Sequence, residues 1–333
     1  MRSRLAILGG GSWGTALAIV LAPKFEQTRL WVFEPDLAER MSVTRVNDVF
    51  LPGFQLPEEV EITGSPEAAV AGAGVVLGVM PSHHARAVYS RVLSALDPSM
   101  VLVSATKGIE NGSLRRMSEV IQEVVRPKFE PRVAVLSGPT FAREVARGEP
   151  TALVAASVDG ALAECIQTVF SGPGFRVYAS TDPVGVEIGA ALKNIIAIGA
   201  GVCHGLGLGS NTTAALITRG LAEVTRLAVS LGGKQQTLAG LAGLGDLVLT
   251  CTGELSRNRM VGLELAKGRK LDEIIGNMKM VAEGVQTTFA AVELASRQGV
   301  EVPIIQQMYQ MLQLGKPPKE AVRELMERSL KAE

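Results

Sequence analysis

One lysine in the second half of the chain stands in a strongly apolar stretch. The helix neighbours of Lys193, three and four positions away, are all small or apolar, namely Gly189, Ala190, Ile196 and Ala197. A buried lysine without a partner loses its proton or disrupts folding, so this one needs a carboxylate or a chemical role. A lysine pKa lowered toward neutrality suits general acid–base chemistry. The alternative is a lysine that reaches toward solvent and pairs with Glu187 or another acid.

A carboxylate in a similar setting is the natural partner. Asp246 lies in the apolar, glycine-rich segment 242–250. We expect Asp246 to face Lys193 and to set the charge and orientation of that lysine, with Thr250 one helical turn further on.

Lys107 is a second candidate cation. It lies between small residues just after an apolar run that ends at Ser104. One interpretation is a surface lysine at a turn, and the other is a cation that holds a substrate. Ligands of α/β proteins bind beyond the carboxyl ends of strands. The loops that follow apolar runs should therefore converge on one crevice, namely 9–14, 33–34, 81–83, 106–108 and 137–142.

A candidate anion site begins at Ser256, in the run Ser-Arg-Asn-Arg. Ser256 could cap a helix, which would place Arg257, Asn258 and the free helix amides where an anion docks. The alternative is an ordinary helix cap with solvated arginines. Lys plus Arg and Asp plus Glu both number 33, so no overall charge attracts anions. A local phosphate site is the more economical interpretation.

A glycine-rich turn near the start of the chain is typical of dinucleotide binding. Gly9, Gly11 and Gly14 follow the apolar run 5–8 and precede the helical pattern 15–22. In this G-x-G-x-x-G pattern the first glycine takes a tight turn, the second admits a pyrophosphate and the third lets the helix approach the strand. The alternative is an incidental glycine turn.

The identity of the dinucleotide is indicated by the residues after the second apolar run. Glu34 lies 20 positions beyond Gly14, where a carboxylate can accept hydrogen bonds from an adenosine ribose. That carboxylate would repel a 2′-phosphate, so NAD is favoured over NADP, and Phe33 could line the adenine slot. The alternative for Glu34 is a solvated carboxylate at a strand end.

Composition excludes several classes of protein. The balanced charge argues against nucleic-acid binding and against an anionic membrane as partner. Three scattered cysteines argue against a disulfide framework, and the three histidines lack a ligand pattern, so we expect no metal site. The segment before Gly9 is too short for a signal peptide, so we expect a cytoplasmic protein.

The hydrophobic pattern changes near residue 180. Before it, apolar runs alternate with helical patterns, which predicts a mainly parallel sheet covered on both faces. The strands are expected at 4–8, 29–33, 74–80, 100–104, 132–136, 151–155 and 174–178, with a loop at 47–58. The helices between them are expected at 15–22, 36–44, 83–95, 113–125, 140–147 and 159–170.

After Asp182, a candidate helix cap, and Pro183 the pattern is helical almost to the end. The expected helices are 183–204, 211–231, 236–249, 256–267, 271–276, 284–298, 303–314 and 317–331. The first is apolar enough to resemble a membrane span, but it contains Glu187 and Lys193, which favours a buried helix. The sequence therefore predicts an α/β protein with a Rossmann-like, doubly wound domain at 1–180 and an all-helical domain at 181–333.

These motifs, in this order, closely resemble the prokaryotic-type NAD(P)-dependent glycerol-3-phosphate dehydrogenase family. The most specific segments are 105–108, 137–141, 192–201, 242–247 with 250–251, 256–258 and 283–284. The resemblance implies reversible reduction of dihydroxyacetone phosphate to sn-glycerol 3-phosphate, which supplies glycerophospholipid synthesis. Many relatives carry Arg or His at the position of Phe33, which suits an NADP phosphate, and this departure again favours NAD.

The resemblance also implies individual contacts, with Lys193 as proton donor and acceptor. The implied cofactor contacts are Ser12, Trp13, Phe33, Lys107, Ala142, Arg257, Val281 and Glu283. The implied substrate contacts are Lys107, Gly138, Thr140, Lys193, Asp246, Ser256, Arg257 and Asn258.

Two other functions remain open at this point. A 3-hydroxyacid or 6-phosphogluconate-type dehydrogenase also joins a Rossmann domain to a helical domain around a lysine. A non-catalytic NAD-sensing module would need no buried lysine opposite an aspartate. We expect a small phosphate substrate and a homodimer as partners, with no stable membrane insertion.

Overall fold

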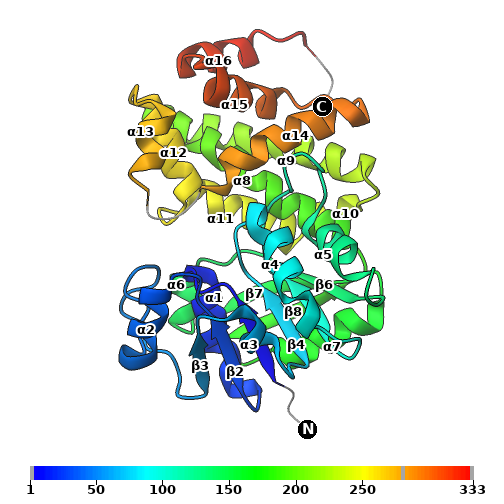
Figure 1. Ribbon diagram of the computed structural model, residues 1–333. Coiled ribbons are helices and arrows are strands. Elements are labelled where there is room, and N and C mark those ends of the chain that lie inside the picture. Colours follow the sequence, from blue (N-terminus) through cyan, green and yellow to red (C-terminus); the bar gives the residue numbers. More distant parts are fainter. Residues whose placement is uncertain (1–3, 279–281, 331–333) are drawn as a thin grey trace.

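An eight-stranded sheet forms the centre of the first part of the chain (Figure 1). The computed structural model describes residues 4–278 and 282–330. The strands are β1 Leu5–Leu8, β2 Thr28–Trp31, β3 Val60–Thr63, β4 Val75–Gly78, β5 Val101–Ser104, β6 Arg132–Ser137, β7 Thr151–Ala156 and β8 Phe175–Ser180. Their order is β3-β2-β1-β4-β5-β6-β7-β8, and every neighbouring pair is parallel except β6 and β7.

Helices cover both faces of this sheet, because its strands are apolar on both sides. One buried cluster joins the sheet to α1 Ser12–Leu21, α2 Pro35–Thr44, α6 Ala142–Ala146 and α7 Gly160–Phe170. The cluster on the opposite face involves α3 Pro66–Val70, α4 Ala85–Val92 and α5 Met117–Val125. Short 3₁₀ turns lie at Ala22–Lys24, Ser82–His84 and Leu93–Ala95. The expected doubly wound, mainly parallel fold is confirmed.

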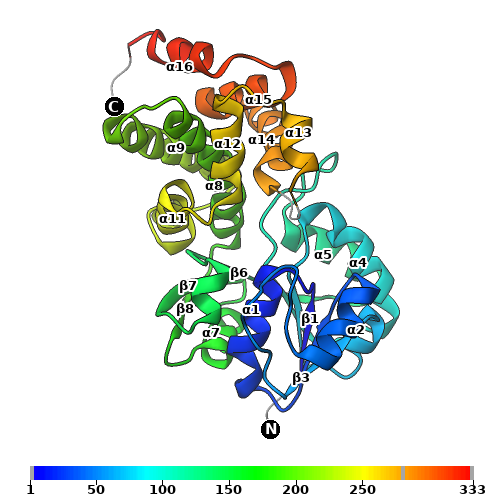
Figure 2. The same ribbon diagram turned by 90° about the vertical axis from the view of Figure 1, so that its left-hand side faces the viewer.

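The second part of the chain is helical and lies above the carboxyl edge of the sheet in both ribbon views (Figures 1 and 2). Its central helix, α8 Pro183–Gly205, packs against α9, α11, α12 and α14. The other helices are α9 Ser210–Ser230, α10 Gln235–Leu238, α11 Asp246–Thr252, α12 Arg257–Ala266, α13 Leu271–Gly276, α14 Glu283–Gln298, α15 Pro303–Leu314 and α16 Pro318–Met326. A π-helical turn spans Leu241–Gly245.

The start of α8 has the local chemistry that the sequence predicts. The Asp182 carboxylate accepts a hydrogen bond from the Gly185 backbone N–H at 2.9 Å, and Pro183 occupies the first helical position. By length and composition α8 could cross a membrane, with a mean hydropathy of 1.5 in its most apolar window. That whole window is buried within the protein, so α8 is the core helix of the second part, as expected.

The structure corrects several expected boundaries. It contains β3 and α3 where no element is expected, and α5 begins at Met117 rather than at residue 113. The periodicity of 236–249 predicts one helix, and this is wrong. Gly243 explains the break, because a Cβ there would lie 2.1 Å from the Leu238 carbonyl oxygen. This close approach produces a π-helical turn between α10 and α11, and the C-terminal helix ends at Met326 instead of 331.

Candidate active site

The glycine-rich turn has the geometry that a dinucleotide requires. Gly9 adopts a φ of +129°, and a Cβ on Gly14 would lie 1.8 Å from the Gly9 carbonyl oxygen. A Cβ on Gly11 would meet no atom within 4 Å, so the turn is open at this point. The three glycines therefore differ as expected. Gly9 takes the turn, Gly14 allows close packing of α1, and Gly11 leaves room for a diphosphate at the helix N-terminus. These residues fit a bound dinucleotide.

The other residues expected to contact the cofactor differ in their burial and position. Trp13 is half-buried against the core, and its indole N–H has no hydrogen-bond partner in the described structure. Phe33 is 71% exposed and meets Trp31 edge to face. Glu34 is exposed at the N-terminus of α2, and Ala142 is the first residue of α6. Val281 lies outside the described residues.

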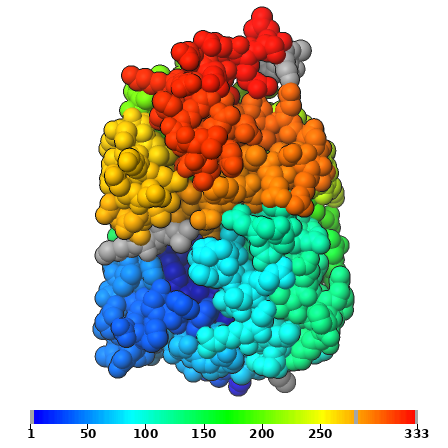
Figure 3. Space-filling view, turned by 45° about the horizontal axis from the view of Figure 1, so that its top comes forward, coloured from blue at the N-terminus to red at the C-terminus, as the bar shows by residue number. Residues whose placement is uncertain are grey.

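Figure 3 shows that the surface is hollowed between the two parts of the protein. The floor of this hollow has the dark blue of the N-terminal residues, and blue and cyan segments of the first part form its sides. The open point of the turn at Gly11 belongs to this N-terminal region. The hollow therefore lies where N-terminal residues of the first part face the helical part.

Lys193 and Asp246 meet inside the helical part, as expected. The Lys193 Nζ atom donates hydrogen bonds to Oδ1 of Asp246 and to Oγ1 of Thr250, the latter at 2.8 Å. The Thr250 hydroxyl in turn donates to the Asp246 carbonyl oxygen at 2.6 Å, which fixes it one helical turn away. Lys193 is 6% exposed and Asp246 is fully buried. Glu187 is not the partner, because its carboxylate binds Arg116 and Ser118 instead.

Lys107 reaches the same aspartate from the first part of the chain. Its Nζ atom donates to Oδ2 of Asp246 at 2.8 Å, to the Gly138 carbonyl at 3.1 Å and to Oγ1 of Thr140 at 3.4 Å. Its side chain is 13% exposed, so the interpretation as a surface lysine is wrong. Asp246 therefore bridges two ammonium groups, one on each carboxylate oxygen. The sequence indicates only the pairing with Lys193, because spacing along the chain carries no signal for a contact between the two parts.

The electrostatics of this cluster favour proton transfer near neutral pH. Burial lowers the pKa of Lys193 to about 7, with a smaller lowering by the nearby Lys107 ammonium, while the Asp246 carboxylate opposes both. Burial also raises the pKa of the Glu283 carboxyl to about 7, against the opposing effects of Arg257, Lys107 and Lys193. The basic group of Lys193 and the acidic group of Glu283 therefore both have a pKa shifted toward neutrality. Such shifts are common at catalytic sites.

The candidate anion site forms at the start of α12. Ser256 caps this helix, and its Oγ atom accepts a hydrogen bond from the Arg259 backbone N–H at 3.2 Å. The buried Asn258 side chain accepts from the Gly284 N–H at 3.0 Å through its Oδ1 atom, which leaves its NH₂ group to donate. Arg257 is half-buried, with the carboxyl group of Glu283 close enough to act on its charge. The expected cap is confirmed.

Two contacts that sequence reasoning missed join the segment 137–142 to α11. A Cβ on Gly253 would lie 2.4 Å from the Phe141 ring, and one on Gly245 would lie 3.7 Å from Pro139. Glycines at both ends of α11 therefore admit the segment that carries Gly138 and Thr140. Among the described residues no cluster of His, Cys, Asp or Glu could hold a metal ion.

Comparison with known proteins gives the family. The model of the NAD-dependent glycerol-3-phosphate dehydrogenase N-terminus matches residues 4–163, and that of the C-terminus matches residues 182–323. The chain belongs to this family. The resemblance inferred from the motifs is thereby confirmed.

Individual relatives agree along nearly their whole length. The chain is 57% identical over 328 residues to the glycerol-3-phosphate dehydrogenase [NAD(P)+] of Koribacter versatilis, covering 98% of this chain and 97% of the relative. It is 53% identical over 333 residues to that of Geobacter sulfurreducens, covering 100% and 99%. The crystal structure of the Coxiella burnetii glycerol-3-phosphate dehydrogenase superposes with a TM-score of 0.94 at 41% identity, covering 98% and 99%. The hydroxyacid-type and NAD-sensing alternatives are not favoured.

Proposed function

We propose that this chain interconverts dihydroxyacetone phosphate and sn-glycerol 3-phosphate by hydride transfer with NAD(P)(H). The observation that carries the proposal is the pair of lysines, one from each part of the chain, that share the Asp246 carboxylate. The names of the full-length relatives support the substrate. In its physiological role the enzyme would supply glycerol 3-phosphate for glycerophospholipid synthesis.

The chemistry divides between the cofactor and the residues of the chain. The nicotinamide, when bound, supplies the hydride for the ketone carbon or accepts it back. Lys193 would donate a proton to the carbonyl oxygen as negative charge develops there, and would remove it from the hydroxyl in the reverse direction. Asp246 holds this ammonium group in place, and Thr250 fixes its orientation. Lys107 and Thr140 would orient the ketone end of the substrate, with the Gly138 segment beside them.

The phosphate of the substrate would bind at the start of α12. Arg257, the NH₂ group of Asn258 and the amides that follow the Ser256 cap supply charge and donors for it. Binding energy from this remote group would hold the reacting carbon in place, which is an efficient use of substrate contacts. Arg257 and Glu283 would contact the cofactor as well.

We infer that the cofactor lies along the glycine turn and that NAD is preferred. Gly9, Gly11, Ser12 and Gly14 would hold the diphosphate, with Trp13, Ala142 and Val281 as further contacts. Glu34 at the N-terminus of α2 would accept hydrogen bonds from the adenosine ribose and repel a 2′-phosphate. The neighbouring Phe33 supplies no positive charge that would attract such a phosphate. Comparison of kcat/KM for NADH and NADPH tests this preference, and a higher value with NADPH would contradict it.

The division of labour between the parts is likewise a proposal. Residues 1–180 would form the dinucleotide-binding domain and residues 181–333 the substrate domain, in a cytoplasmic homodimer. Light scattering during gel filtration should give twice the chain mass of 35.1 kDa, and a monomer would contradict the proposal.

Loss of nicotinamide absorbance on addition of dihydroxyacetone phosphate tests the function. We expect rapid NADH oxidation with this substrate, slow oxidation with dihydroxyacetone, which lacks the phosphate, and none with 3-oxo acids. Turnover with 3-oxo acids alone would assign the hydroxyacid alternative. Cofactor binding without turnover of any of these ketones would indicate a sensing module.

A further inference from the structure

A buried ion pair joins the two parts of the chain away from the reacting groups. Glu187 of α8 is 7% exposed and accepts hydrogen bonds from the Ser118 backbone N–H at 2.8 Å and the Ser118 hydroxyl at 2.6 Å. Its carboxylate also pairs with the Arg116 guanidinium at 2.6 Å. Arg116 and Ser118 open α5, which packs on the sheet, so a carboxylate of the helical part caps a helix of the first part.

Arg116 is also connected to the loop that carries Lys107. Its backbone pairs with Ile109 in an isolated antiparallel bridge, two positions after Lys107. The next residue of the loop, Glu110, is bound by Arg86 through two nitrogens and donates its backbone N–H to the Arg115 carbonyl at 2.9 Å. Arg116 therefore contacts the Lys107 loop through the bridge to Ile109, and Arg86 and Arg115 hold the next residue of that loop.

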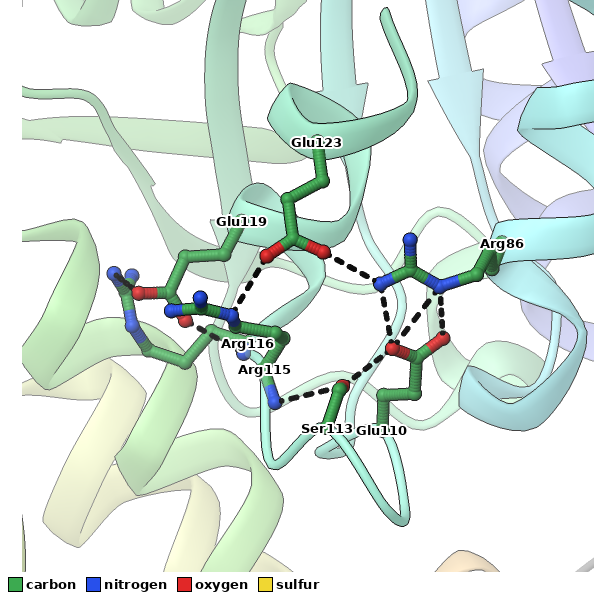
Figure 4. A network of polar contacts seen from close by, with 7 residues as sticks. All are labelled: Arg86, Glu110, Ser113, Arg115, Arg116, Glu119 and Glu123. Atoms are coloured by element: carbon green, nitrogen blue, oxygen red, sulfur yellow. Dashed lines mark hydrogen bonds and ion pairs between the residues drawn. The ribbon is translucent and has the colours of Figure 1, made fainter.

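Figure 4 shows the polar network that surrounds this connection. Arg86 lies between the carboxylates of Glu110 and Glu123, and Arg115 pairs with Glu123 from the other side. Arg116 pairs with Glu119, which also accepts its backbone N–H in a capping box. The loop between β5 and α5 is thus tied at several points to the start of α5.

We propose that Arg116 and Glu187 are positioning residues that set Lys107 and Lys193 at the correct separation on Asp246. The inference rests on the proposed function. Glu187 and Lys193 lie on the same continuous helix, six positions apart, so the place of one fixes the place of the other. Arg116 fixes Lys107 in the same way through the bridge to Ile109. The ion pair therefore completes a continuous series of contacts from Lys107 to Lys193.

Glu187→Gln tests this role, because it removes the charge and keeps the size of the side chain. We expect kcat to fall about 10- to 100-fold, the loss that follows a small misplacement of catalytic groups. The NADH dissociation constant should change less than about twofold, since the glycine turn is untouched. The matched control is Glu223→Gln, another buried carboxylate that accepts backbone N–H groups at a helix start, those of Ile304 and Ile305. It should leave kcat unchanged.

The pH profile of kcat separates positioning from general stability. Lys193 is faced by Asp246 and Cys251 of α11, by Lys107 of the first part and by Glu283 of α14. If Lys107 withdraws from Asp246, its repulsion of the Lys193 charge weakens. The apparent pKa of the profile should then rise in Glu187→Gln and stay unchanged in Glu223→Gln.

A second variant guards against a failure of Glu187→Gln to fold. Ser118→Ala keeps the ion pair but removes the hydroxyl that donates to Glu187, and it should lower kcat several-fold with the same direction of change in the pH profile. Wild-type kcat and an unchanged pH profile in a folded Glu187→Gln or Ser118→Ala protein would overturn the inference. Absence of activity in the wild-type protein would instead overturn the proposed function, so the two failures are distinct.

Discussion

Lys107 and Asp246 form an ion pair of 2.8 Å although 139 positions separate them in the chain. Lys107 follows a strand of the first part, and Asp246 opens a helix of the second. The other oxygen of the same carboxylate holds Lys193. This cluster of two lysines and one aspartate is therefore complete only when both parts of the chain are in place.

The phosphate site predicts a selective effect of Arg257→Ala. Loss of a charge-assisted hydrogen bond removes about 1.5–3 kcal/mol, so KM for dihydroxyacetone phosphate should rise about 10- to 100-fold. Steady-state kinetics with dihydroxyacetone, which lacks the phosphate, should change much less. Arg269→Ala, beyond the end of α12 in an exposed pair with Glu264, is the matched control. Equal losses with both ketones would argue against a phosphate clamp.

The three glycines of the turn should not be equivalent to replacement by alanine. Gly11→Ala meets no atom within 4 Å, so it should fold normally, but its methyl group should weaken NADH binding by about 1–3 kcal/mol where the diphosphate approaches. Gly14→Ala would place a carbon 1.8 Å from the Gly9 oxygen and should lower the unfolding free energy as well. Fluorescence titration with NADH and denaturant unfolding measure the two effects. Wild-type NADH affinity in Gly11→Ala would refute the assigned diphosphate position.

The lowered pKa of Lys193 predicts that kcat depends on pH in opposite ways for the two directions of the reaction. Ketone reduction needs the protonated amine, so its kcat should fall as pH rises through about 7. Oxidation of glycerol 3-phosphate needs the neutral amine, so its kcat should fall as pH decreases through the same range. Profiles of kcat in both directions, at saturating substrate, measure this. Limbs that run in the same direction would exclude Lys193 as the proton carrier.

Glu223 predicts a pH dependence of stability that is separate from activity. Burial raises the pKa of this carboxyl to about 7 from an ordinary value of 4.5. Between these values the unfolded chain releases the proton first, so the unfolding free energy should fall by up to about 3 kcal/mol as pH rises. Glu223→Gln should lack the Glu223 share of this decrease and keep the share of Glu283, whose pKa is raised to the same value. Urea unfolding at several pH values compares the two proteins, and identical slopes would contradict the prediction.

Local patterns were sufficient to predict the parts of the site that lie within one element. The G-x-G-x-x-G turn, the Ser256 cap and the apolar setting of Lys193 each depend on neighbours within a few residues. The facing of Lys193 and Asp246 was also predicted, because each charge lies in an apolar segment and needs a partner of opposite charge. Their chemical roles stay predictions.

Contacts between the two parts of the chain could not be predicted from the sequence. The bond from Lys107 to Asp246 and the pair of Arg116 with Glu187 depend on how the two parts pack. The short strand β3 lies at the edge of the sheet, and Val60 is its one buried residue, so its apolar pattern is weak. The π-helical turn was missed because helical periodicity continues through Gly243, and only the close approach to Leu238 interrupts it.

The central claim is that Lys193 moves the proton, and Lys193→Met tests it most directly. Steady-state reduction of dihydroxyacetone phosphate by NADH should lose about 10²- to 10⁴-fold in kcat, the usual contribution of a general acid. The NADH dissociation constant should remain near the wild-type value, and the exposed control Lys267→Met should retain full activity. A folded Lys193→Met protein that turns over at a near-normal rate would contradict the account.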